Sequence, residues 1–458
     1  MSSLYSSLAV ATGALGAEQG AMDATTNNVA NVNTPGYSRQ RPVLVESDPV
    51  VVGSVAYGTG VSLEKLESLR DPILQLRIQE ETQQQGQLNA TVTAMQQAQA
   101  QFTTSSSDIG TEISSFFSSL QQLSTDPSNL ALRQGVLTAA GNMSTAFNNT
   151  ADALTAQQSN LDLNVTQDVQ QINVLTGQIA TLNNQISQLQ GVNQDASALV
   201  DQRDVLIGQL SNLVDVSTIQ SDNGLTLTTA NGTALVVGGQ SFALSTQTNA
   251  SGLQDVYAQG NNITANLTSG DLGGVLQVRD QTVPGLLSNL DTLAAGLSNA
   301  LNAANGQGFD LNGNAGGNLF VAPPASGQGA AAGMAVGITD PSLIAASSDG
   351  SPGSNGNLAA LTAIQNQPLG GAQTPTDYYS SIVFAVGNDV SNGSAELSSS
   401  QLILNQLQDQ RGSISGVSLD EEASNMVQYQ RAFDAAAQVV TTINDMLYTV
   451  INMGTLTG

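Results

Sequence analysis

Apolar residues near the N-terminus recur every seven positions. The series consists of Leu8, Leu15, Met22 and Val29, and Leu4 occupies the alternate position of the same stripe. A seven-residue period keeps one apolar face turned toward a partner helix, as in a coiled coil. The pattern predicts a helix over residues 3–29, which the polar, proline-containing run at 31–36 ends.

The C-terminal segment has the same period and predicts a helix over residues 419–452. Acidic residues in its first turn, Asp420 to Glu422, favour a helix start there through the helix dipole. The repeat alone leaves two alternatives: an assembly seam, or two core-facing helices of one globular bundle. We expect the seam, with both ends mobile in an isolated monomer and ordered on assembly. Its C-terminal positions are Met426, Tyr429, Phe433, Val440, Ile443, Leu447 and Val450.

The middle of the chain predicts a helical body with one β insertion. Around residue 215 the apolar period changes to two, and Asn-Gly and Gly-Gly pairs then mark tight turns. The fold class is therefore mainly α with a small all-β insertion, in a discontinuous multi-domain arrangement. The expected domains are 1–45 with 415–458 (terminal coiled coil), 46–215 with 266–414 (helical body) and 216–265 (β-rich insertion).

Finer expectations divide the body into its elements. Residues 43–63 are expected to be extended, and 305–357 to be loops with a few strands. A helix begins near residue 71. The other helices are expected at 108–124, 128–158, 162–190, 195–214, 270–304 and 376–410.

Charge and composition exclude several classes of function. The net charge is −26 and only 10 residues are Lys or Arg, so the chain cannot neutralise a nucleic-acid backbone or an anionic membrane. It has no His, Cys or Trp, which removes imidazole and thiolate chemistry. Asp310 begins a segment that looks like a calcium loop, but Val321 stands where the last carboxylate belongs. We expect no catalytic, metal or cofactor site.

Two aspartates in the predicted helix at 195–214 are assigned a structural role. Asp201 and Asp204 flank Arg203, and we interpret them as a salt-bridged helix surface rather than an active site.

The first positive charge of the chain is Arg39, and no run approaches the roughly 20 apolar residues of a membrane span. We therefore expect neither a cleaved signal peptide nor a membrane span.

Residues 26–40, TNNVANVNTPGYSRQ, resemble the segment that follows the first helix of bacterial flagellar rod, hook and hook-associated proteins. Pro35 and the following Tyr-Ser-Arg-Gln make the segment similar to the hook-associated protein 1 family. Residues 199–214, 269–313 and 417–433 are also similar to that family. The motif positions are Asn28, Ala30, Asn31, Asn33, Thr34, Gly36 and Tyr37.

This resemblance implies a structural subunit of the hook–filament junction ring. Its partners would be copies of itself, the hook protein, a second junction protein and an export chaperone at the 419–452 helix. It would leave the cell unfolded through the flagellar type III apparatus and reside in the extracellular flagellum. Two rival interpretations remain: another axial subunit of the hook or distal rod, or a secreted coiled-coil adhesin or effector with residues 216–265 as its head.

Overall fold

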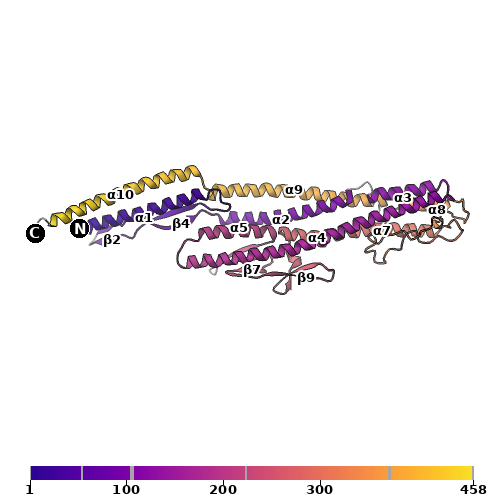
Figure 1. The fold of residues 1–458 in the computed structure, drawn as a ribbon, viewed down its shortest axis with the longest axis horizontal. Coiled ribbons are helices and arrows are strands. Elements are labelled where there is room, and N and C mark those ends of the chain that lie inside the picture. The colour runs from indigo at the N-terminus through magenta and orange to yellow at the C-terminus, as the bar shows by residue number, and fades with distance from the viewer. Residues whose placement is uncertain (1, 53–54, 104–107, 222–223, 370–372, 456–458) are drawn as a thin grey trace.

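The protein is an elongated array of long helices, with the two chain ends together at one tip (Figure 1). This computed structural model describes residues 2–52, 55–103, 108–221, 224–369 and 373–455. The fold class expected from the sequence is confirmed: long helices form most of the molecule, and small antiparallel sheets accompany them.

The terminal unit consists of α1 (Ser2–Ala30) and α10 (Leu419–Thr455), which lie side by side. An antiparallel hairpin packs along α1. Its inner strands are β1 (Gln40–Glu46) and β4 (Val61–Ser68), and its tip strands are β2 (Val50–Val52) and β3 (Val55–Tyr57). A boundary at residue 45 would divide this hairpin, although both of its inner strands contact α1.

The helical body is built from α2 (Pro72–Thr103), α3 (Ile109–Leu123), α4 (Leu130–Gly191), α5 (Ser197–Leu213) and α9 (Pro375–Ser415). α2 packs along α9, and α3 packs against α4. Side-chain caps begin several of these helices. Asp71 accepts hydrogen bonds from the backbone N–H groups of Ile73 and Leu74, and Asn129 accepts from the start of α4.

α4 is one uninterrupted helix of 62 residues, roughly 93 Å long at about 1.5 Å per residue. The prediction of two helices, 128–158 and 162–190, was therefore wrong. Residues 157–160 are polar, but they contain no Pro or Gly. Gln158 donates to the Arg279 carbonyl and Leu161 is buried, so tertiary contacts hold the helix together across the polar stretch.

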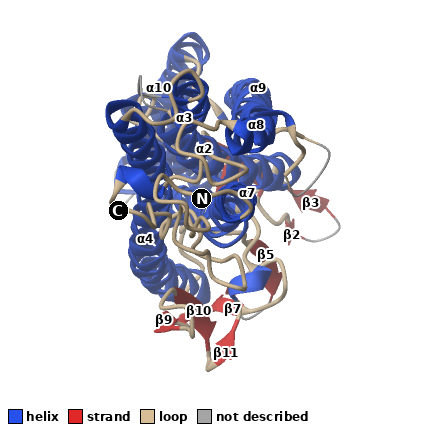
Figure 2. Ribbon diagram, turned by 90° about the vertical axis from the view of Figure 1, so that its right-hand side faces the viewer, coloured by secondary structure: helices blue, strands red, loops and turns tan. Residues whose placement is uncertain are grey.

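The β insertion has two small sheets against α4. One contains β5 (Ser217–Ser221), β6 (Gly224–Thr228), β7 (Ala234–Val237) and β8 (Gln240–Ser241), and the other contains β9 (Leu244–Thr248), β10 (Gln254–Ala258) and β11 (Asn261–Asn262). Figure 2 shows these strands gathered at one side of the helices. The fully buried Arg279 fastens the insertion, because Nη1 lies 2.7 Å from both Asp162 Oδ1 and the Gln254 carbonyl.

After the insertion the chain forms α6 (Gly270–Gln277), a π turn (Val278–Thr282) and α7 (Val283–Gly306). The helix expected at 270–304 is thus interrupted. Pro284 lacks an N–H and its ring would clash with the carbonyl four residues earlier, so the wider turn relieves the conflict. Short helical turns lie at Thr264–Asn266, Pro341–Leu343 and Ile364–Asn366, and α8 covers Gly356–Ala363.

The segment from 307 to 355 follows a loop path. In place of the strands expected there, the described chain forms isolated bridges that join Phe309 to Ala315 and Ser347, and Phe320 to Val336. Phe320 is fully buried and stacks edge-on against Phe116 of α3. The loop segment therefore closes the far end of the helical core.

Candidate assembly joint

Three segments that are far apart in the sequence meet where the terminal unit joins the body. They are the turn after α1, the first half of α5 and the start of α10 (Figure 1). All three carry residues that the sequence singles out. Their contacts are polar, and several of the residues that make them are buried. Only 10% of the residues in the chain are charged, so this is a local concentration of charged side chains.

Asn28 lies at the centre of the joint and is 1% exposed. Its Nδ2 donates to the Gln40 carbonyl at 2.9 Å and to Glu422 Oε2 at 3.1 Å. Its Oδ1 accepts from the Tyr37 hydroxyl at 2.8 Å and from the Gln40 N–H at 2.9 Å. Both donors and both acceptor sites of the amide are therefore used, so this side chain fixes the exit of α1 relative to the start of α10.

Glu422 ties the same turn to α10. Its side chain is 2% exposed, and Oε1 accepts from Arg39 Nε at 2.6 Å. Arg39 also bonds Glu421 at 2.6 Å, and its backbone N–H donates to the Ser415 carbonyl. A buried carboxylate is stable only where partners satisfy it, and here a guanidinium and an amide do so. The acidic first turn of α10 thus has a role beyond helix-start electrostatics.

Asp201 connects the joint to the body. Its carboxylate accepts from the Ser38 N–H at 3.0 Å, from the Ser38 hydroxyl at 2.8 Å and from Arg70 Nη2 at 2.9 Å. The salt bridges expected of this group are present, between Asp201 and Arg70 and between Arg203 and Asp204. Its expected place on a helix surface was wrong, because Asp201 and Arg203 are 7% and 9% exposed. The turn after α1 covers Asp201 through the bonds from Ser38.

Gly36 lets the turn pass close to α5. Its φ is +82°, and a Cβ there would lie 2.3 Å from Val205 Cγ2. Both the backbone angle and the close approach require glycine. The Gly36 carbonyl accepts from Arg411 Nη2 at 2.8 Å, which brings the end of α9 into the joint.

The Tyr37 hydroxyl remains protonated across the physiological range. Burial, together with the negative charges of Asp201 and Glu422, raises the pKa of Tyr37 to about 12. The hydroxyl can therefore act as the donor that Asn28 Oδ1 requires.

The remaining motif residues lie at the outside of the turn. Ala30 and Asn33 are exposed. Asn31 Nδ2 donates to the Asn27 carbonyl at 3.0 Å, and Thr34 Oγ1 bonds Asn31 Oδ1 at 3.1 Å. These bonds close the end of α1 without contacting another segment.

The predicted seam positions lie along the paired faces of α1 and α10 to different depths. On α10, Ile443 and Leu447 are buried and Val450 is exposed. On α1, Val29 is exposed. The other seam positions are half-buried: Leu4, Leu8, Leu15, Met22, Met426, Tyr429, Phe433 and Val440.

Small residues form the deepest positions of α1. Ala17, Ala21 and Ala24 are at most 2% exposed. The charge of Glu18 contributes, after burial, to a raised pKa of Tyr429, so the two helices face each other within one chain at this level. The heptad pattern identified the paired faces but not the alanines that allow the close approach.

The outer faces of the terminal unit are apolar as well. Val439 is 49% exposed, Met446 50%, Ile451 56% and Tyr448 71%, all on α10. Val51 at the hairpin tip is 66% exposed. Val439 and Met446, seven residues apart, lie on the same side of α10, and exposed apolar patches are typical of interaction sites.

Within the described ranges, no cluster of three or more potential metal-ligating side chains occurs. None of the described helices has the combination of length and apolar character that a membrane crossing needs.

Comparisons with known proteins cover the joint and the body. A flagellar hook-associated protein 1 from Bacillus subtilis is 30% identical, and the alignment covers 99% of both chains. The chain belongs to the flagellar hook-associated protein 1 family. The Escherichia coli member of this family is 28% identical over 96% of this chain and 98% of its own. Hook-associated proteins of this family are structural components of the flagellar axis, and the extracellular flagellum is where they reside.

Family matches follow the architecture of this hook-associated protein. Residues 95–320 match the flagellar hook-associated protein FlgK helical domain. Residues 8–37 match the flagella basal body rod protein family, and 410–453 match the C-terminal family of the flagellar basal body rod FlgEFG proteins. The two terminal matches contain Asn28 and Glu422 of the joint, and the helical-domain match contains Asp201. The matched families are flagellar structural families, and none of them is catalytic.

A solved structure has the same fold. The flagellar hook junction protein FlgK from Burkholderia pseudomallei superposes with a TM-score of 0.67 at 18% identity. The superposition covers 74% of this chain and 100% of that one. At this identity the likeness supports the fold alone.

Sequence reasoning identified the residues of the joint but missed their partners. Asn28 and Glu422 are 394 positions apart, and no local pattern links them. The usable signal is the scarcity of charge. In a chain with so few ionised residues, clusters such as Asp201 to Asp204 stand out as candidates for specific contacts.

Proposed function

We propose that this chain is a subunit of the junction between hook and filament. Its terminal unit, residues 1–45 with 415–458 together with the hairpin, would assemble with other copies and with the hook protein and a second junction protein. The rest of residues 46–215, with 266–414, would form the body outside that layer, and the 216–265 insertion the outermost part. We further propose export in an unfolded state through the flagellar type III route without a cleaved signal peptide.

The observation that carries this proposal is a row of exposed apolar residues on α10. Val439, Met446 and Val450 follow one another at seven- and four-residue spacings on one side of the helix, and they are 49%, 50% and 41% exposed. Burying apolar surface contributes about 25 cal/mol per Å², so such a face favours contact with neighbours. The paired seam would then order the terminal unit while its outer face is buried in the assembly.

An export chaperone is the other proposed partner, and α10 is its proposed site. An amphipathic helix with an apolar face is suited to lie in the groove of a binding protein. The same face cannot contact a chaperone and an assembled neighbour at once. Chaperone binding would therefore keep this surface covered until export.

Deleting the gene and examining cells by electron microscopy, with immunoblots of the medium, tests the junction role. Hooks without filaments, with filament subunit shed into the medium, are expected. Normal filaments would overturn the proposal in favour of an adhesin or effector, and loss of the hook would indicate a rod or hook subunit.

Complementation with surface variants then tests the terminal unit. Val439→Asp, on the outer face of α10, is expected to fail to restore filaments although the protein is made. Leu163→Asp is the matched control, because Leu163 is 61% exposed on α4 of the body. Equal restoration by both variants would contradict an assembly role for the α10 face.

A further inference from the structure

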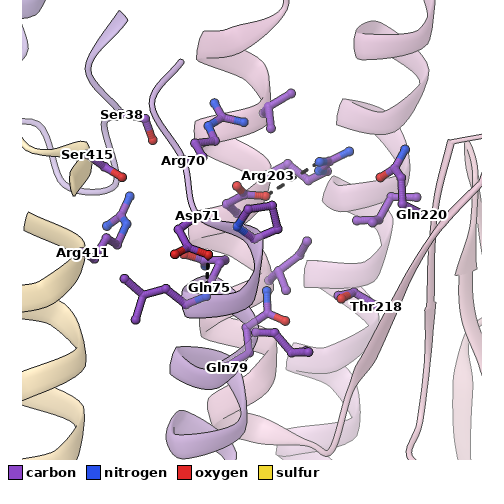
Figure 3. Close-up of a pocket in the computed structure, with 17 residues that line it drawn as sticks. Ser38, Arg70, Asp71, Gln75, Gln79, Arg203, Thr218, Gln220, Arg411 and Ser415 are labelled. Atoms are coloured by element: carbon purple, nitrogen blue, oxygen red, sulfur yellow. Dashed lines mark hydrogen bonds and ion pairs between the residues drawn. The ribbon is translucent and has the colours of Figure 1, made fainter. Parts of the chain in front are cut away.

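A polar pocket of about 390 Å³ lies beside the joint, and nothing above assigns it a role. The start of α2, one face of α5, strand β5 and the end of α9 surround it (Figure 3). Its lining includes Arg70, Arg203 and Arg411, three of the ten basic residues in a chain of net charge −26. Asp71 and Asp204 line the pocket as well, so arginines and aspartates meet there.

Arg203 is the most enclosed of the three. It is 9% exposed, and its Nη1 donates to Asn183 Oδ1 at 3.2 Å. Its Nη2 lies 3.8 Å from the nearest carboxylate oxygen, that of Asp204, and its Nε has no hydrogen-bond partner among the described residues. A buried guanidinium without a close counter-ion is costly, and a bound anion would reduce that cost.

The other two arginines are also incompletely matched. Arg70 bonds Asp201 and the Ser197 carbonyl through Nη2, which leaves Nη1 without a hydrogen bond to the described chain. Arg411 bonds only the Gly36 carbonyl, and no described carboxylate lies within 4.0 Å of it. Donors from three separate helix ends therefore remain available.

The acidic groups at the pocket satisfy these guanidinium groups only in part: Asp201 contacts Arg70 at 2.9 Å, and Asp204 lies 3.8 Å from Arg203. Asp71 is engaged as the cap of α2, where its Oδ1 accepts two backbone N–H groups. Burial raises the pKa of Asp204, and the positive charges of Arg203, Arg70 and Arg411 oppose this rise. Burial, and then the positive charge of Arg70, lowers the pKa of Arg203 despite the opposing effect of Asp204.

We propose that this pocket binds an oxyanion, a carboxylate or phosphate group held by Arg70, Arg203 and Arg411. Guanidinium groups suit planar oxyanions because they form paired, charge-assisted hydrogen bonds. Bound there, the oxyanion bridges α5, α9 and the start of α2 next to the joint and stiffens the link between terminal unit and body. The group comes either from a free ion or from an acidic side chain of a second copy.

Inorganic phosphate, added to the full chain at constant ionic strength, tests the first source. A saturable rise in the thermal midpoint is expected, because binding to the folded state alone stabilises it. Arg411→Gln and Arg203→Gln are each expected to weaken the apparent affinity by roughly tenfold, the effect of one lost charge-assisted hydrogen bond. Arg41→Gln is the control, since Arg41 is 62% exposed on the hairpin and pairs with Glu67.

Sedimentation at low salt tests the second source. If a neighbour's acidic side chain fills the pocket, Arg411→Gln weakens self-association, phosphate competes with it, and Arg41→Gln changes nothing. If Arg203→Gln does not fold, Arg411→Gln still carries both tests. The proposal is overturned if phosphate binding is absent or equal in Arg411→Gln and wild type, and self-association is also insensitive to that substitution.

Discussion

The helical body and the terminal unit bury their apolar residues in different ways. In the body, Phe116, Phe117 and Phe147 are fully buried inside one chain. In the terminal unit, the deepest positions of α1 are alanines, and large residues such as Tyr448 and Ile451 remain exposed. The body therefore has a core of large side chains within one chain, whereas the terminal unit packs on small side chains and leaves large ones exposed.

The joint between the body and the terminal unit relies on a different kind of contact from either region. The joint is held by amides and charges, including Asn28, Glu422 and Asp201, rather than by apolar packing. Directional hydrogen bonds define an angle better than apolar contacts do, because they tolerate little displacement. A polar joint can therefore fix the angle between the body and the terminal unit.

The largest expected effect is on the body core. Phe117→Ala should lower the free energy of unfolding by about 3–5 kcal/mol, because it removes a fully buried ring. Phe433→Ala, at a half-buried position of α10, should change it by less than half as much. Urea denaturation of both variants measures the difference. An equal loss of unfolding free energy in both variants would contradict the difference in packing between the body and the terminal unit.

A smaller and more local effect is expected at the joint. Asn28→Ala leaves the buried Glu422 and Gln40 groups without their partner, which costs about 1–3 kcal/mol. Limited proteolysis should then remove residues before about 45 and after about 415 faster than in the wild type, while the body remains resistant. Asn31→Ala, whose bonds stay within the end of α1, is the control. Faster cleavage throughout the body would contradict a local role for Asn28.

The smallest expected effect is a pH dependence confined to the body. Asp168 lies on α4, and burial, followed by the influence of Asp271 of α6, raises the pKa of Asp168 to about 7 from the ordinary 3.8. Between these values the folded protein holds a proton that the unfolded chain releases. This contribution to stability is therefore fully present below about pH 4 and lost as the pH rises through about 7.

Asp168→Asn, which imitates the protonated acid, should reduce this pH slope in thermal melts. Burial also raises the pKa of Asp215 to about 7, so part of the slope should remain. Asp152→Asn, at an exposed position of the same helix, should leave the slope unchanged. An identical slope in Asp168→Asn and wild type would contradict the raised pKa of Asp168.

Local patterns predicted the fold class and both terminal helices, because apolar periodicity is a property of neighbouring residues. They did not predict that α4 is continuous, since Leu161 is buried by contacts from distant segments. The joint was predictable only as a set of residues. Which of them face inward depends on the backbone path: Asn28 is buried, whereas Ala30 and Asn33 of the same motif are exposed.

The contact between Asn28 and Glu422 also orders events in time. It joins residues 394 positions apart, and the entropic cost of closing a loop increases with the length of the loop. Neighbouring helices such as α3 and α4 pair over short separations and fold early, so the joint closes last. A chain cut before residue 419 can still build the α3–α4 core but has no α10 to dock. Completion of the polypeptide is thus the condition for forming its assembly end.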